Sequence, residues 1–422
     1  MELYTETSKS IQDLTSSPSN LFEIYTLNIL ISFGYYTIVI LVPLYFNSQF
    51  GLTDSQAGIV FTCCGVCLGV SALLGSKLIT LTGCKKGLSL ATFSIFAGFV
   101  LLSMSQNLKF SLFAALGLVC SGIGTSWPLL GIAIKHYSEL RNRSTSNSIM
   151  MMGNYLSGII AGAYIDIVWN YFIDKNTIFE IIFTTAAGAL GLSFCISLTL
   201  KSDDFSDSLL LNTSSLILNK KFFKFFCFIL LVTLLHSICF EQLDATFPKY
   251  LVRTSGDKSH FGVFLAIHSA NMLIGALAFT PLTFKLSSYT LILIGASFGL
   301  AACWVLSLGS TNINYICYVL LLSTGESILV PRTLDYTMKV AESGEEGLYL
   351  ALSNSPFYFG MILTGFVSGE LFERYCEPGR TEDCGKMWEK VTLLSALAFA
   401  ALIVCKPCLS LEKNPESEEI VK

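Results

Sequence analysis

Long apolar segments recur twelve times along this chain of 422 residues. Each is roughly 20 residues long, the length that an α-helix needs to cross about 30 Å of hydrocarbon. Backbone groups in lipid must be hydrogen-bonded within their own segment, so such segments are expected to be helices. The predicted spans are 21–46, 56–81, 88–105, 108–135, 146–169, 178–200, 222–248, 260–284, 287–308, 313–338, 347–372 and 388–407. This pattern predicts an all-α integral membrane protein with 12 transmembrane helices.

The scarcity of charge supports this prediction. Only 13% of the residues are charged and 53% are hydrophobic, whereas a soluble domain has about a quarter of its residues charged. The net charge is −4, and no basic stretch is large enough to suggest a nucleic-acid partner. The expected partners are therefore the lipid bilayer and a small-molecule substrate, and we expect the chain to act as a monomer.

The spans are predicted to form two six-helix bundles, at 21–200 and 222–407. Residues 201–221, which carry charge and Ser/Asn clusters, read as a cytoplasmic linker between them. The remaining segments, 1–20 and 408–422, are predicted to be cytoplasmic tails, and the first of them lacks the features of a cleavable signal peptide. Weak similarity between the halves is typical of transporters built from duplicated bundles.

The distribution of Lys and Arg predicts the orientation. With the N-terminus inside, sixteen of these residues fall on cytoplasmic segments and nine on outside segments, as the positive-inside rule requires. Both termini are then cytoplasmic. The plasma membrane is expected rather than a vacuolar or lysosomal membrane.

The cysteines predict one candidate disulfide and no metal site. Cys376 and Cys384 lie in the last outside loop, where an oxidising compartment permits a bridge, although spacing alone does not establish the geometry. The other twelve cysteines lie in or beside spans, where a thiol packs as a small hydrophobe. We expect neither a metal nor a cofactor.

Ionisable residues deep in predicted spans are the strongest functional candidates, because each costs at least a few kcal/mol to place in lipid. Glu326 lies at the centre of span ten and Glu241 in the outer half of span seven. His236 and His268 lie in spans seven and eight. The alternative for each is a structural hydrogen bond within the helix bundle. Four acidic residues near span ends are expected to be solvated: Asp166, Glu180, Asp244 and Glu370.

Several aromatic and amide side chains are candidates for lining a substrate cavity, with ordinary packing as the alternative. These residues are Tyr35, Tyr36, Trp127, Asn154, Tyr155 and Asn354.

Three segments resemble the major facilitator superfamily and, more narrowly, its proton-coupled oligopeptide transporter branch. Tyr35-Tyr36 with the segment GLTDSQAG at 51–58 is similar to the first span of that branch. Phe240-Glu241-Gln242 resembles its span-seven signature, and Gly325-Glu326 with Pro331 resembles its span-ten pattern. The resemblance implies that Glu241 takes part in proton coupling and that Glu326 meets the amino group of a substrate.

The chain departs from that branch at its first-span proton motif of two glutamates and an arginine. The corresponding positions are Asn28, Ile31 and Ser32. The superfamily's loop after span two is retained in part, as Gly83, Lys85 and Lys86, and this is the candidate gating loop.

The sequence therefore predicts a secondary active transporter of a small polar or zwitterionic solute such as an amino acid or peptide. Alternating access of two bundles would move the solute, with a proton gradient as the driving force and with His236, Glu241 and His268 in the coupling. A uniporter or metabolite exporter is the alternative within transport. A sensor with the same fold is the alternative outside it. No catalytic constellation indicates an enzyme.

Overall fold

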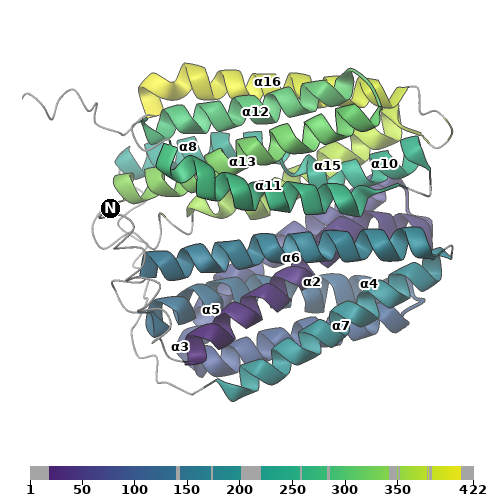
Figure 1. The fold of residues 1–422 in the computed structure, drawn as a ribbon, viewed down its shortest axis with the longest axis vertical. Coiled ribbons are helices and arrows are strands. Elements are labelled where there is room, and N and C mark those ends of the chain that lie inside the picture. The colour runs from purple at the N-terminus through teal and green to yellow at the C-terminus, as the bar shows by residue number, and fades with distance from the viewer. Residues whose placement is uncertain are drawn as a thin grey trace, which may run out of the picture. The chain divides into compact units, whose positions relative to one another are not determined.

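A computed structural model of the chain describes residues 19–138, 143–172, 174–200, 220–256, 259–282, 286–341, 349, 352–377, 379 and 383–409. Regular structure in this part of the chain is helical throughout, with no strand (Figure 1). The predicted tails and linker fall almost wholly outside the described residues.

The chain divides into two compact units. The first unit comprises Met1–Ser208 with Asp257–Ala266, and the second comprises Leu209–Gly256 with Ile267–Lys422. The helices of the first unit are α2 (Ser19–Phe50), α3 (Asp54–Met104), α4 (Leu108–Leu112), the π-helix η1 (Phe113–Cys120), α5 (Ser121–Tyr137), α6 (Arg143–Tyr171) and α7 (Lys175–Thr199). Those of the second are α8 (Lys220–Cys239), α9 (Gln242–Ala245), α10 (Phe247–Ser255), most of α11 (Phe261–Leu282), α12 (Ser288–Ser307), α13 (Asn312–Val340), α15 (Ser355–Tyr375) and α16 (Cys384–Leu409). The bundle boundaries at 21–200 and 222–407 remain predictions.

Eleven helical stretches of the described chain are long and apolar enough to cross a membrane. The remaining long helix, α15, has 21 residues, which also suffices for a crossing, but it is less apolar. Large apolar side chains such as Leu73, Ile167, Ile313 and Val404 are exposed on the surface. A helix that is apolar on its outer face as well as its inner face is expected in lipid. The predicted all-α, multi-pass membrane fold is confirmed.

Polar side chains next to the spans define where several helices begin. Thr53 and Gln56 form a reciprocal capping box at the start of α3, and Thr311 and Asn314 form another at the start of α13. Asp174 accepts a hydrogen bond from the backbone N–H of Thr177 at the start of α7. These side chains satisfy N–H groups that have no partner inside the helix.

The helix α3 contains two predicted spans joined by a kink at Gly83. The range of α3 comprises two helices that meet at Gly83, the residue with a non-helical conformation, so the connection between spans 56–81 and 88–105 is a tight turn at this glycine. Gly83 has φ 77° and ψ 165°, a conformation that only glycine adopts readily. Lys85 is half-buried and Lys86 is exposed just beyond the kink. The candidate gating residues Gly83, Lys85 and Lys86 thus lie at the tight turn between two membrane-spanning helices.

Candidate functional site

The second unit positions Glu326 through close contact between α12 and α13. A Cβ atom on Gly295 would lie 2.6 Å from the carbonyl oxygen of Gly325, and a Cβ on Gly325 would lie 2.5 Å from that of Gly295. Both distances are too short for a real side chain, so the two backbones touch only because both residues are glycine. Small residues at helix crossings permit such contact in membranes. Glu326 directly follows this crossing.

The helix that carries His236 is interrupted at Phe240 and Glu241. The N–H groups of both Phe240 and Glu241 donate to the carbonyl oxygen of His236, at 2.8 and 3.1 Å. In a regular helix the N–H of Glu241 would donate to Ser237 instead, so the Ser237 carbonyl loses its usual partner. This interruption ends α8 at Cys239 and places Glu241 between two helices.

Side chains replace the lost backbone hydrogen bond. The Ser237 carbonyl accepts from the side chain of Gln242 at 3.3 Å and from the hydroxyl of Thr364, on α15, at 2.7 Å. The Thr246 hydroxyl is hydrogen-bonded in turn to the Gln242 side-chain oxygen and to the hydroxyl of Ser368, also on α15. Broken helices of this kind are tolerated at membrane depth where neighbouring helices supply the missing partners.

Four titratable side chains form a continuous chain across α11, α13 and α8. His268 Nε2 lies 2.9 Å from Glu326 Oε2, within hydrogen-bond distance. His236 Nε2 lies 3.7 Å from the other oxygen of Glu326, and His236 Nδ1 lies 3.6 Å from Glu241 Oε1. All four side chains are at most 14% exposed. The order along the chain is therefore His268, Glu326, His236, Glu241.

A third carboxylate belongs to the same cluster. Asp244 is half-buried and within electrostatic reach of both His268 and Glu326. With all three carboxylates ionised, the cluster carries a charge of −3 when both histidines are neutral and −1 when both are protonated. Uncompensated buried charge is costly. The cluster therefore favours the uptake of protons or of a cationic group.

Glu241 has no spare room on the side of α15. A Cβ atom on Gly360 would lie 3.1 Å from Glu241 Cγ and 3.4 Å from its Oε1. The other oxygen, Oε2, is buried without a hydrogen-bond partner. The carboxylate is thus packed tightly against α15 while one of its acceptors remains unsatisfied.

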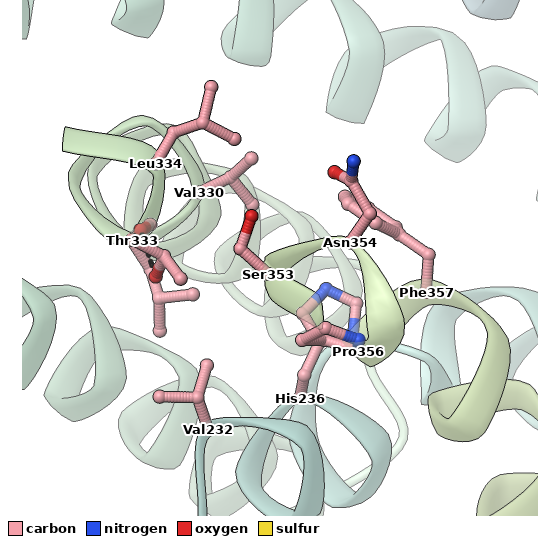
Figure 2. A pocket seen from close by; sticks show the side chains of 10 residues that line it. Val232, His236, Val330, Thr333, Leu334, Ser353, Asn354, Pro356 and Phe357 are labelled. Carbon is pink, nitrogen blue, oxygen red and sulfur yellow. Dashed lines mark hydrogen bonds between the residues drawn. The ribbon is translucent and has the colours of Figure 1, made fainter. Parts of the chain in front are cut away.

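His236 also lines a pocket in the second unit. The pocket has a volume of about 20 Å³, which is room for about one water molecule. Figure 2 shows the imidazole beside Pro356, with Asn354 and Phe357 on the neighbouring segment. The rest of the lining is mostly apolar and consists of Val232, Leu329, Val330, Thr333, Leu334 and Ser353. Asn354, a predicted substrate contact, therefore shares this pocket with His236.

The predicted binding residues of the first unit include an aromatic group and an amide side chain. Tyr35 packs edge-on against Tyr36 and against Trp127, with ring centroids 5.4 and 5.0 Å away. Asn154 Oδ1 accepts hydrogen bonds from Asn28 at 2.7 Å and from Ser32 at 2.8 Å.

Asn154 and Tyr155 are both half-buried on α6. Asn28 and Ser32, the positions where the first-span proton motif is absent, thus form a neutral amide and hydroxyl cluster with Asn154.

The remaining predictions have mixed outcomes. Cys376 and Cys384 form a disulfide. Glu180 and Glu370 are exposed as expected. The expectation that Asp166 and Asp244 are solvated is wrong, since Asp166 is only 7% exposed and accepts a hydrogen bond from Asn170 at 3.2 Å.

Three features of the site carry no signal that sequence reasoning used. Gly360 and Thr364 contact the interrupted helix from α15. Asn271, one turn after His268, donates to Ser323 on α13 at 2.7 Å. The sequence signal that could have indicated this last contact is a polar residue three positions after a histidine within a predicted span. Among the described residues, no group of three or more His, Cys, Asp or Glu is arranged to hold a metal ion.

The sequence of the chain is similar to a known family of membrane proteins. The model of the Major Facilitator Superfamily matches residues 24–372. An uncharacterized MFS-type transporter, YvkA of Bacillus subtilis (strain 168), is 27% identical over 205 residues, which are 47% of this chain and 44% of the relative. The match thus covers less than half the length of that relative.

Solved structures share the fold at low sequence identity. A POT family transporter in complex with 5-aminolevulinic acid has a TM-score of 0.78 at 16% identity, covering 93% of this chain and 97% of the other. A peptide transporter POT in complex with sulfate has a TM-score of 0.77 at 14% identity, covering 93% and 95%. The nucleoside transporter NupG has a TM-score of 0.75 at 14% identity, covering 92% and 99%.

Proposed function

Because the chain belongs to the major facilitator superfamily, we propose that it is a proton-coupled secondary transporter of a small, amino-bearing zwitterion. Its family and fold point to a transporter and not to an enzyme. In this proposal two bundles expose a central site alternately to each side of the membrane. A proton gradient supplies the driving force, and no cofactor is required.

The observation that carries the proposal is the buried chain of His268, Glu326, His236 and Glu241. Intramembrane ionisable groups mark ion pathways and proton relays, and here four of them adjoin one another. A cluster with three carboxylates and two imidazoles gains stability when it binds a proton or a cation. Proton uptake and the binding of a charged solute therefore both change the net charge of the same buried cluster, and this couples the two events.

Within this scheme Glu326 binds the amino group of the substrate. His268 occupies one of its oxygens at 2.9 Å, which leaves Oε1 available to a ligand. Asn354 supplies an amide in the adjoining pocket. The uncharged parts of the substrate are proposed to contact five side chains of the first unit. These are the aromatic rings of Tyr35, Tyr36 and Trp127, the amide of Asn154 and the hydroxyl of Tyr155.

Positions 28 and 32 hold neutral residues, Asn28 and Ser32, and this affects how a substrate carboxylate can be bound. The neutral cluster around Asn154 offers hydrogen bonds but no positive charge. The substrate carboxylate is therefore expected to be bound by hydrogen bonds alone on this side. We propose a monomeric transporter in the plasma membrane with both termini in the cytoplasm.

The proposal is tested by flux into proteoliposomes that contain the purified full-length chain. Labelled alanyl-alanine, 5-aminolevulinic acid and single amino acids serve as probes, and labelled uridine serves as a zwitterion-free comparison. Uptake is measured with and without an inside-alkaline pH gradient. The expected result is accumulation of at least one zwitterion that requires the gradient.

Two variants assign the roles within the site. Glu241→Gln is expected to abolish gradient-driven accumulation, and Glu326→Gln is expected to weaken binding of the transported probe at least tenfold. Glu180→Gln, an exposed carboxylate on α7, is the matched control and should behave as the wild type. Gradient-independent uptake of every transported probe would contradict the proton coupling. Uptake of uridine but of no zwitterion would contradict the substrate class.

A further inference from the structure

His236 lies almost midway between two carboxylates without bonding to either. Its Nδ1 is 3.6 Å from Glu241 Oε1 and its Nε2 is 3.7 Å from Glu326 Oε1. Both distances exceed the usual 2.7–3.2 Å of an N–H···O hydrogen bond. Both ring nitrogens are buried and have no hydrogen-bond partner. A buried imidazole with two orphaned nitrogens departs from the general rule that buried polar groups are paired.

The imidazole cannot satisfy both carboxylates at once. The two nitrogens flank one carbon of a rigid ring and their N–H directions diverge strongly, so a movement of the ring along one N–H direction shortens that distance and lengthens the other. The arrangement therefore has two favourable positions, one bonded to Glu241 and one bonded to Glu326. The observed position lies between them.

The surroundings of His236 permit such a movement. The ring packs against both Phe240 and Phe357, and each of their ring centroids is 5.4 Å from that of the imidazole. These contacts restrict sideways displacement. The pocket beside Asn354 and Pro356 leaves empty space next to the ring (Figure 2). The aromatic contacts thus restrict the position of the ring, and the pocket leaves space for a small displacement.

We propose that His236 is a two-position proton carrier that bonds alternately to Glu241 and Glu326. The proposal deepens the proton coupling suggested above and rests on it. A protonated Glu326 gives its proton to Nε2 of the neutral ring, which becomes an imidazolium. The Nδ1 proton then passes to the Glu241 carboxylate. One proton has left Glu326 and one has reached Glu241, and the ring is neutral again.

The ring now carries its proton on Nε2, and it regains the starting tautomer when the same steps run in reverse. The reverse sequence carries a proton from Glu241 to Glu326. Every bond that breaks in this cycle is an N–H or O–H bond, and no electron is transferred.

The geometry links this carrier to the substrate. Glu326 Oε2 is already bonded to His268, so the substrate amino group and His236 compete for Oε1. A bound amino group then displaces His236 toward Glu241. The other titratable groups near the cluster are Asp244, His268 and Tyr318. Asp244 interacts electrostatically with both Glu241 and Glu326, His268 bonds to Glu326, and Tyr318 interacts with Asp244 and Glu326.

The carrier is tested without any substrate, with the proton as the only ligand. The full-length chain is labelled with ¹⁵N in its four histidine rings, placed in lipid nanodiscs and studied by NMR. The His236 signals are assigned by their loss in His236→Gln. Glu241→Gln should hold the ring at Glu326 and Glu326→Gln should hold it at Glu241. The two variants should therefore shift the His236 signals in opposite directions from the wild type, whereas Glu180→Gln should not shift them.

Shifts in the same direction, or no shift in either variant, would overturn the proposal. If a variant fails to fold, the proposal is tested on the His236 signals of the wild type alone. Two positions in exchange on the μs–ms timescale give relaxation dispersion of the His236 signals, and a ring held in one place gives none. Absence of relaxation dispersion at His236 in the wild type would therefore overturn the proposal as well.

Transport separates this inference from the proposed function. In proteoliposomes, His236→Gln should keep exchange of the zwitterion that the wild type accumulates but lose gradient-driven accumulation. Wild-type proton coupling with unchanged accumulation by His236→Gln would refute the carrier and leave the proposed function intact. Absence of proton coupling in the wild type would refute the proposed function, while the NMR result would still report on the ring positions.

Discussion

The contact between Gly295 and Gly325 should tolerate no side chain. In Gly295→Ala the new methyl would lie 2.6 Å from the Gly325 carbonyl oxygen and 3.0 Å from the backbone nitrogen of Leu329. Ordinary contacts begin at 3.4 Å, so α12 and α13 must separate by about 0.8 Å. Backbone atoms cannot move aside as a flexible side chain can. The strain is therefore expected to remain in the folded state.

The free energy of unfolding should report this strain. Overpacking of this kind costs about 1–3 kcal/mol, and replacing glycine by alanine within a helix returns about 0.5–1 kcal/mol. Gly188→Ala on α7 is the matched control, because no atom lies within 4 Å of its added Cβ. The control keeps the helix gain without the clash. The two variants should therefore differ by about 1–3 kcal/mol.

Thermal unfolding in detergent measures the difference. For a body of 150–250 residues each kcal/mol corresponds to about 2–4 °C, so Gly295→Ala should melt roughly 2–12 °C below Gly188→Ala. Gradient-driven uptake should fall in parallel, because a shift of this size is enough to lengthen the 2.9 Å contact between His268 and Glu326 beyond hydrogen-bond range. Equal melting temperatures and equal uptake for the two variants would refute the close helix crossing.

Two further predictions concern the first unit. Gly83→Ala should destabilise the chain by about 1–3 kcal/mol through its backbone conformation alone, because no atom lies near the added methyl; Gly131→Ala, equally uncrowded but helical, is the control in the same thermal assay, and equal stability of the two would contradict the kink. Thr177 donates side-chain and backbone hydrogen bonds to Asp174, and these lower the pKa of its carboxyl below 3.8. Since the folded-state pKa is depressed, the capping contribution is present above about pH 4 and is lost as the pH falls through the lowered pKa. The protection of the amides at the start of α7, relative to their intrinsic exchange rate at the same pH, should therefore fall below pH 4 in the wild type but not in Asp174→Ala, and equal pH dependence in both would contradict the cap.

The spans were predictable because lipid imposes both their length and their apolar character. The breaks within them were not. Span seven was expected to run without interruption from 222 to 248, yet it is broken at Phe240 and Glu241. Neither residue is a helix breaker. The break is stabilised by partners on α15, such as Thr364, which lie more than 100 positions away in the sequence.

The identities of the site residues were predictable, but their mutual arrangement was not. Burial cost alone singles out Glu241, His236, His268 and Glu326 as unusual. A helix that is apolar on all sides gives no periodic signal for its rotation about its own axis. Which of these side chains face one another therefore depends on helix crossings such as Gly295 with Gly325. The same limitation explains why Asp244 was expected to be solvated.

The contact between Glu241 and Gly360 ties together two positions that lie on different helices. A side chain at 360 would occupy the place of the Glu241 carboxylate, whose Cγ would be only 3.1 Å from the new Cβ. A shorter residue at 241 would leave a void that alanine or serine at 360 is well placed to fill. Among related chains these two positions are therefore expected to change as a pair, so that a larger residue at 360 identifies a protein that has given up the acidic group at 241.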